Sequence, residues 1–247
     1  MAIGEKLYHR VAGAIEEGIC SGRYPEGTRL PGERDLAEEF GVSRPTIREA
    51  MIALEIRGLV SVRHGSGLFV MPQASRPRSA PELDVGAFEL IEARILFEGE
   101  AAALAATAID APALERLGLI LDEMDSGSAG HAQRMDADRE FHLLIAEATG
   151  NSLVLNTVET LWNVREQSPL CAHMFDKARR EGVTPRVDEH RLIVEALRNK
   201  DADGARRAMR AHLKRVSEDV LEATELELIE QARSEIEAHR NRLARRV

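Results

Sequence analysis

The sequence predicts a mainly α-helical protein, in which three helices and a β-hairpin near the N-terminus precede an antiparallel all-helical bundle. Its 247 residues suffice for two domains that each bury a core. Aromatic residues make up 4% of the chain and hydrophobic residues 44%, a balance that favours packed helices over sheets. Apolar residues at helical spacing, interrupted by Gly and Pro, divide the chain into short helices.

Charge and cysteine content exclude several classes of protein. The net charge is −9, and residues 1–72 hold 9 Lys and Arg against 10 Asp and Glu, so any contact with nucleic acid must be local. No stretch reaches the roughly 20 apolar residues of a membrane span and no signal core follows the first residues, so we expect a cytoplasmic protein without a membrane partner. Cys20 and Cys171 form no C-x-x-C pair and are expected to be reduced packing residues.

The first forty residues predict two helices and a loop. Apolar residues at three- and four-residue steps indicate a helix over residues 7–19. Residues 24–31 contain two Pro and a Gly and are expected to form a loop. A short helix is expected over residues 33–40, ended by Gly41, where a left-handed conformation is favoured.

The next thirty residues complete a winged helix-turn-helix. Ser43 is a good N-cap, with Pro45 in the first turn, for a helix that reaches about residue 57. Alternating apolar and polar residues over 59–70 flank the turn His64-Gly65-Ser66-Gly67 and predict a β-hairpin, the wing. Two helices joined by a Gly-containing turn can place the second helix in the major groove of DNA.

The first turn of this second helix and the tip of the wing are the expected DNA contacts. Arg reads guanine edges or grips phosphates, and Gly lets the backbone approach the duplex. Any single Arg here is more simply a solvated side chain, but several around one loop and wing favour DNA contact. The expected contacts are Arg34, Ser43, Arg44, Thr46, Arg48, His64 and Gly65.

The segment LPGERDLAEEFGVSRPTIREAMIALEIRGLV, followed by HGSGLFV, resembles the GntR family of regulators over its whole length. The resemblance implies a transcription regulator whose partner is double-stranded operator DNA. It also implies that the family's DNA-contacting positions are occupied by Arg34, Arg44, Thr46, Arg48, His64 and Gly65.

A linker is expected over residues 73–84, which combine Pro, Ser and Arg without an apolar period. It separates a DNA-binding domain over 1–72 from a helical domain over 85–224. The helix that starts at Asp201 is expected to reach about Thr224, and the last segment, 225–247, has helical composition and a basic end and is expected to be a solvated helical tail. Within the helical domain we expect helices over 85–106 and 135–149, helices capped by Asp110, Asn151, Thr184 and Asp201, and a partly helical segment over 170–183.

Two pairs of side chains in this domain predict a metal site. Asp138 and His142 are four residues apart and project from one face of a helix. His190 and His212 are equally distant from residue 201, the centre of the connector NKDADG, so they lie side by side in an antiparallel hairpin. A lone His is more simply a packing residue, but two matched pairs favour a metal. Three His and one Asp suit a divalent transition ion (Zn, Ni, Mn or Fe), with positions left for water or a ligand oxygen.

The order DREFHLLIAEATGN, DEHRLIVEAL and MRAHLKRV resembles the FCD-type effector domain of FadR-like GntR regulators, over roughly residues 87–222. The resemblance implies that the cation helps to hold a carboxylate effector. It also implies that the metal ligands are Asp138, His142, His190 and His212.

Arg94 is a candidate effector contact. Arg94 and Glu98 are four residues apart on one expected helix, and an Arg that faces a bundle cavity suits a bidentate carboxylate contact. The alternative is an intrahelical ion pair at the surface. The resemblance to the FCD domain favours the effector contact.

The stretches FELIEARILFEGEAA and LWNVREQSP are similar to those of hexuronate-responsive repressors, which sense sugar acids such as glucuronate, galacturonate or fructuronate. This similarity implies an effector pocket lined by Trp162, Arg165 and Glu166, with Trp162 packed on a sugar face and Arg165 on the carboxylate. The alternative is one aromatic core residue beside a solvated ion pair.

We therefore expect a homodimeric transcription regulator, a repressor, controlled by a small carboxylic acid that binds at a metal. Three alternatives remain: a regulator that senses lactate, pyruvate, glycolate or citrate, a purely structural metal, and a metal-dependent enzyme fused to a DNA-binding module. Against the enzyme, no further acid or base stands at a motif spacing near the four ligands, so we expect no catalytic residue.

Overall fold

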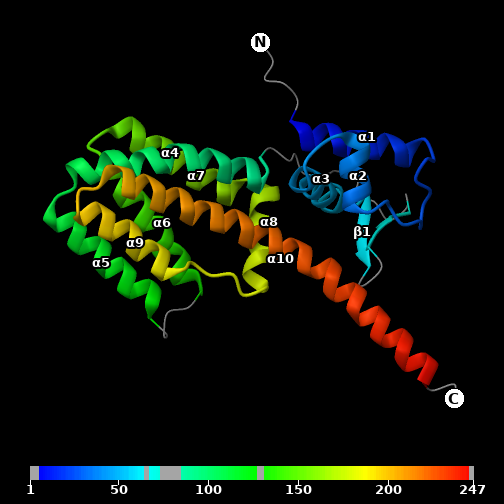
Figure 1. The fold of residues 1–247 in the computed structure, drawn as a ribbon. Coiled ribbons are helices and arrows are strands. Elements are labelled where there is room, and N and C mark those ends of the chain that lie inside the picture. The colour runs from blue at the N-terminus through cyan, green and yellow to red at the C-terminus, as the bar shows by residue number, and fades with distance from the viewer. Residues whose placement is uncertain (1–5, 64–66, 73–84, 127–130, 245–247) are drawn as a thin grey trace, which may run out of the picture. The chain divides into compact units, whose positions relative to one another are not determined.

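The computed structural model describes residues 6–63, 67–72, 85–126 and 131–244. Residues 87–220 form one unit, and the residues on either side of them belong to a second. In Figure 1, α1 to α3 and β1 of the second unit run from blue to cyan, and α4 to α9 of the first run from green to yellow. The expected linker and the tip of the wing, His64 and Gly65, lie outside the described residues.

The N-terminal elements form three helices and a two-stranded antiparallel hairpin, which confirms the predicted winged helix-turn-helix. The side chains of Ile15, Leu36 and Ile47, one from each helix, are fully buried in a shared core. The two strands pair with Val60 opposite Val70. The elements are α1 (Leu7–Cys20), α2 (Glu33–Phe40), α3 (Arg44–Ile56), β1 (Val60–Arg63) and β2 (Gly67–Val70).

Local sequence signals set the ends of these helices. The Ser43 hydroxyl accepts a hydrogen bond from the backbone N–H of Thr46 and caps α3, as expected. Gly41 ends α2 in the left-handed region with φ 64°. Residues 27–30, expected to be a loop, are tied to β2 by backbone hydrogen bonds and extend the sheet edge.

The unit formed by residues 87–220 is an all-helical bundle, as predicted. Its main core combines apolar side chains from α4, α5, α6, α9 and α10, of which Ile120, Phe141, Ile193 and Leu213 are fully buried. The elements are α4 (Ala87–Ala108), α5 (Ala111–Asp125), α6 (His131–Glu147), α7 (Ser152–Gln167), α8 (Pro169–Arg180), α9 (Val187–Arg198) and α10 (Ala202–Ala244).

Most helix starts in this unit follow the expected caps. Asp110 accepts from the N–H of Ala113 at 2.9 Å, and Asp201 accepts from the N–H of Gly204 at 2.8 Å. Asn151 caps α7 in the same way. These side chains satisfy backbone donors that have no partner within the helix.

Two expectations about helix ends are wrong. Thr184 does not cap α9, because residues up to Arg186 stay extended and the helix begins at Val187. The final helix does not end near Thr224 but continues to Ala244. Residues 225–247 contain neither Gly nor Pro, so nothing in the sequence interrupts the helix.

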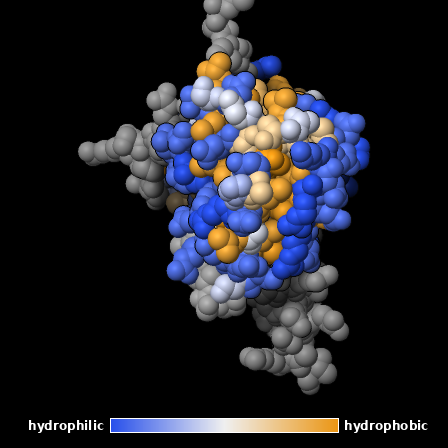
Figure 2. All heavy atoms as spheres, turned by 90° about the vertical axis from the view of Figure 1, so that its left-hand side faces the viewer, coloured by the Kyte–Doolittle hydropathy of each residue, from blue (hydrophilic) through white to orange (hydrophobic). Residues whose placement is uncertain are grey.

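The surface of the bundle carries scattered apolar side chains. Figure 2 shows one face, on which apolar surface lies among larger polar areas. The most exposed large apolar residues of α4 are Leu96, Phe97 and Leu104. Within the described ranges, every helix is too short or too polar to span a bilayer.

Candidate metal and ligand site

The four predicted metal ligands meet inside the helical unit. Asp138 and His142 come from α6, His190 from α9 and His212 from α10. Each offers one donor atom, and these four atoms all lie within 4.8 Å of one another. All four side chains are buried. The His190 and His212 ring centroids are 4.4 Å apart, as the register of the α9–α10 hairpin predicts.

Each histidine is held by a partner at its Nδ1 atom. The His190 Nδ1 lies 2.9 Å from the backbone oxygen of Arg186, and the His212 Nδ1 lies 3.0 Å from Glu189 Oε2. The His142 Nδ1 lies 2.5 Å from Glu98 Oε2. A protonated Nδ1 leaves Nε2 with a free lone pair, the arrangement in which histidines ligate metals. The Nδ1 contacts of His190 and His212 favour this arrangement, and the His190 Nε2 also lies 3.0 Å from Asp138 Oδ1, a contact that a cation between the two atoms would replace.

The protonation states of the cluster also suit a cation. Burial lowers the pKa of His142, and it lowers the pKa of His212 to about 4, so both rings are neutral near pH 7. Burial alone would raise the pKa of Asp138, but His190, His142 and Arg165 outweigh it and lower that pKa, which keeps Asp138 ionised. Metal ligation requires these states.

Neither ring nitrogen of His142 makes a hydrogen bond within the described residues. The carboxylate oxygen nearest to the His142 Nε2, Asp138 Oδ1, is 3.8 Å away. An unsatisfied buried acceptor is costly. A cation between His142 and Asp138 would satisfy it, so the residues present fit a divalent transition metal.

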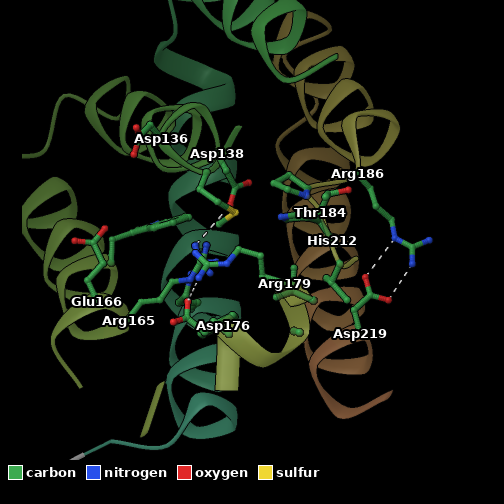
Figure 3. Close-up of a pocket in the computed structure, with 18 of the residues that line it drawn as sticks. Asp136, Asp138, Arg165, Glu166, Asp176, Arg179, Thr184, Arg186, His212 and Asp219 are labelled. Carbon is green, nitrogen blue, oxygen red and sulfur yellow. Dashed lines mark hydrogen bonds and ion pairs between the residues drawn. The ribbon is translucent and has the colours of Figure 1, made fainter. Parts of the chain in front are cut away.

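A cavity of about 320 Å³ opens beside the cluster. Asp138 and His212 belong to both, so a ligand in the cavity reaches the metal site directly. Figure 3 shows Arg165, Glu166 and Arg179 around the same space, with the Arg186–Asp219 ion pair at the side of α10. The cavity is thus lined by both acidic and basic groups.

Arg165 places a positive charge at the wall of this cavity. Its guanidinium lies over the rings of Trp162 and Phe175, at 5.0 and 4.3 Å from their centroids. The nearest acid is Asp138 Oδ2 at 3.8 Å, and the guanidinium makes no hydrogen bond within the described residues. Burial lowers the pKa of Arg165 to about 10, so it remains charged at pH 7. Its donors are available to a carboxylate.

Arg94 is engaged differently. Its Nε donates to Glu98 Oε1 at 2.6 Å, and its guanidinium lies 4.2 Å from the centroid of Trp162. The ion pair that the sequence offered as an alternative exists, but at 2% exposure of each side chain it is buried rather than at the surface. Arg94 also lines the cavity, so the two interpretations are compatible.

Trp162 and Glu166 sit at opposite extremes of burial. Trp162 is 1% exposed and packs with Ala146 and Val158, so it is a core residue that also lines the cavity. The Glu166 side chain is 66% exposed at the rim.

Sequence reasoning did not assign supporting roles to Glu98, Glu189 and Arg186, which hold the three imidazoles. Glu98 was seen only as a partner of Arg94, and Glu189 directly precedes a ligand. A signal existed for Glu98, because it stands four residues from Arg94, the single basic residue of this Ala-rich helix. The Arg186 support uses a backbone oxygen and leaves no mark in the sequence.

In the N-terminal unit, the first turn of α3 is accessible. Arg44 and Ser43 are exposed, and Thr46 is partly exposed with its hydroxyl 2.8 Å from the Ser43 hydroxyl. The Arg34 side chain on α2 is 89% exposed. The exposure of these four side chains is compatible with the predicted DNA contacts, which stay predictions.

Arg48 lies differently from the expectation that it faces DNA. It is 2% exposed, and its guanidinium donates from Nε and Nη2 to the two carboxylate oxygens of Glu33. This bidentate pair joins α2 to α3. A DNA contact by Arg48 would require the pair to open, so that contact stays a prediction.

A winged helix-turn-helix combined with a helical unit that encloses a polar cavity defines the class of DNA-binding regulators with a separate effector domain. Residues 7–70 match the model of bacterial regulatory proteins of the gntR family, and residues 89–215 match the FCD domain. The chain belongs to the GntR family of transcription regulators, in the FadR-like subgroup that carries an FCD domain.

Three relatives bear this out. The Uxu operon transcriptional regulator of Escherichia coli K12 is 38% identical, over 88% of each chain. The Exu regulon transcriptional regulator of the same organism is 35% identical, over 84% of this chain and 82% of the relative. The putative L-lactate dehydrogenase operon regulatory protein of E. coli K12 is 30% identical, over 86% of each. These relatives are transcription regulators, which confirms the prediction that the chain is not an enzyme.

Proposed function

We propose that this regulator, acting as a homodimeric repressor, is controlled by a hexuronate or related sugar acid that binds a divalent transition metal held by Asp138, His142, His190 and His212. The observation that carries this is the position of Arg165, whose guanidinium lines the cavity beside the metal cluster and has only a 3.8 Å ion pair with Asp138 among the described residues. A carboxylate in the cavity would meet the metal on one side and Arg165 on the other.

The charges around the cluster explain why an acid would need the metal. Arg94 and Arg165 contribute two positive charges, and Glu98, Asp138 and Glu189 contribute three negative ones. Without a metal the immediate surroundings are net negative and repel an anion. A divalent cation reverses the sign and leaves an excess of one positive charge, which a monocarboxylate would neutralise.

The lining of the cavity supports a polyhydroxylated acid. Besides the proposed metal ligands, the lining includes Asp136, Asp176, Arg179 and Thr184, which can accept hydrogen bonds from hydroxyl groups or donate hydrogen bonds to them. Trp162, at 1% exposure, supports this lining by packing against the guanidinium groups of Arg94 and Arg165. The relatives named as Uxu and Exu regulators are consistent with control by hexuronates.

The second candidate effector is a smaller acid such as lactate. It is favoured by the similarity to the putative L-lactate dehydrogenase operon regulatory protein. The two candidates separate in a thermal-shift screen of the Zn²⁺-loaded protein against glucuronate, galacturonate, fructuronate, lactate, pyruvate, glycolate and citrate. Stabilisation by hexuronates alone supports the proposal, and stabilisation only outside the sugar acids overturns that assignment.

The role of the metal is tested by repeating the screen after chelation. If the metal forms part of the effector site, its removal abolishes the stabilisation by the acid as well as lowering the melting temperature. If the metal is purely structural, the protein melts earlier but the acid still stabilises it.

The proposed link to DNA is a shift between two arrangements of the effector domain, only one of which suits the operator. A ligand biases such an equilibrium only through its different affinity for the two states. The contacts proposed for DNA are Arg34, Ser43, Arg44 and Thr46, with Arg48 and the wing residues His64 and Gly65.

A further inference from the structure

Glu98 divides its two carboxylate oxygens between the metal cluster and the cavity. Its Oε2 lies 2.5 Å from the Nδ1 of His142, and its Oε1 accepts a hydrogen bond from the Nε of Arg94 at 2.6 Å. The Glu98 side chain is 2% exposed, so water does not substitute for either partner. One buried carboxylate therefore contacts both a metal ligand and an arginine that lines the cavity.

Neither partner of Glu98 has a competing anchor. The Arg94 guanidinium makes its only ion pair among the described residues with Glu98, and otherwise packs on Trp162. His142 has no hydrogen bond that fixes its ring within the described residues, so the close approach of Glu98 is what orients it. The orientation of Oε2 toward His142 in turn depends on Arg94 holding Oε1.

We infer that Glu98 is a positioning residue that couples metal affinity to Arg94, so that the cavity arginine supports the metal site through this carboxylate. The inference rests on the proposed function for the metal site but not on the identity of the acid. It predicts that Arg94, although positively charged, favours the binding of a cation.

The direction in which replacing Arg94 changes the metal affinity distinguishes a positioning role from simple electrostatics. Removing a nearby positive charge should by itself raise the affinity for a metal ion, because the repulsion is lost. Under the positioning role, R94M instead lowers the affinity, because Glu98 loses the partner that fixes its direction. Outer-shell partners of metal-ligating histidines typically contribute about 10- to 100-fold in affinity.

The test uses the full-length protein and Zn²⁺ alone, titrated by calorimetry. E98Q should weaken Zn²⁺ binding by about 10- to 100-fold. R94M should also weaken it, and R94M should have no additional effect in the E98Q background. Higher affinity in R94M, or equal effects of R94M with and without Glu98, would overturn the inference.

Two controls keep the test decisive. E98Q leaves Arg94 buried without a counter-charge and can fail to fold. The E98Q R94M double variant removes both charges together, and its Zn²⁺ affinity can be compared directly with those of R94M and the wild type. E189Q is the matched control, because Glu189 holds His212 from α9 and has no contact with Arg94 among the described interactions. E189Q should weaken Zn²⁺ binding and leave the R94M effect intact.

Failure of the inference and failure of the proposed function give different results. If the wild-type protein does not bind Zn²⁺, the metal site itself is wrong. If the wild type binds Zn²⁺ and R94M follows simple electrostatics, only the role of Glu98 is wrong.

Discussion

The imidazole of His190 lies against that of His212 because the two residues are equally distant in sequence from Asp201, which caps the second helix of their hairpin. Lys200, with φ 55°, takes the left-handed turn that ends α9. The turn is therefore short, and the two helices run antiparallel from it. A sequence change in this turn would shift the register of two proposed metal ligands at once.

Replacing either residue by alanine tests the ligand set. H190A and H212A should each lower Zn²⁺ affinity by roughly 100-fold or more, because four ligands share the roughly 10–16 kcal/mol of a structural zinc site. Calorimetric titration of the purified proteins measures the loss. H173A, on α8 and outside the cluster, should bind Zn²⁺ like the wild type. Unchanged affinity in both cluster variants would contradict the proposed site.

Metal removal should destabilise the folded protein. Because the unfolded chain has no preformed site, metal at 100 times its dissociation constant stabilises the fold by about 2.7 kcal/mol. Chelation should therefore lower the melting temperature in differential scanning calorimetry. The H190A variant should show no comparable difference between its two states, and a chelator effect of the same size in H190A would argue against this site as the origin.

Arg165 should matter for the acid and not for the metal. R165M removes a charged hydrogen-bond donor to the carboxylate, so hexuronate affinity of the Zn²⁺-loaded protein should fall by about 10- to 100-fold. R165K should lose a similar amount, because Lys lacks the bidentate geometry. Fluorescence titration with glucuronate provides the measurement. R191M alters an arginine outside the cavity and serves as the control; equal losses in R165M and R191M would refute a specific contact.

Arg44 and Arg48 should separate DNA contact from stability. Arg44 is exposed, so R44A should weaken binding to a duplex of arbitrary sequence and reduce the slope of log affinity against log salt by about 1. R48M removes the close partner of Glu33, leaving the Arg44 guanidinium at 3.9 Å, and should cost about 3 kcal/mol in the free energy of unfolding.

Anisotropy titrations over a salt series and urea unfolding give the two measurements. The E33Q R48M double variant should recover part of the lost stability, because both charges are then absent. If R48M keeps wild-type stability but loses DNA affinity as R44A does, Arg48 faces DNA and the Arg48–Glu33 pair is of little consequence in solution.

Much of the fold can be predicted from the sequence, because the residues that begin and end each helix lie close to it in the chain. Ser43, Asp110, Asn151 and Asp201 each cap the helix expected of them, since a side-chain oxygen next to an apolar period acts within three residues. Thr184 shows the limit. The helix begins only at Val187, after Arg186, whose side chain pairs with Asp219 of α10, a contact between residues far apart in the chain.

The candidate site likewise has some features that the sequence predicts and others that it does not. Its four central side chains follow from helix periodicity and the symmetry of one hairpin, which are properties of short segments. The depth of the Arg94–Glu98 pair does not, because an i, i+4 pair looks the same in sequence whether it is buried or solvated. Burial of Arg48 is hidden for the same reason, since it depends on Glu33 of the preceding helix.

Trp162 is the chain's single tryptophan, and it is buried against Arg94 at the wall of the cavity. The ultraviolet emission of the protein excited at tryptophan wavelengths therefore originates at one known position. Its indole N–H has no hydrogen-bond partner within the described residues, so the emission should be sensitive to any polar group that arrives nearby. The molecule carries its own label-free optical probe of what enters the effector domain.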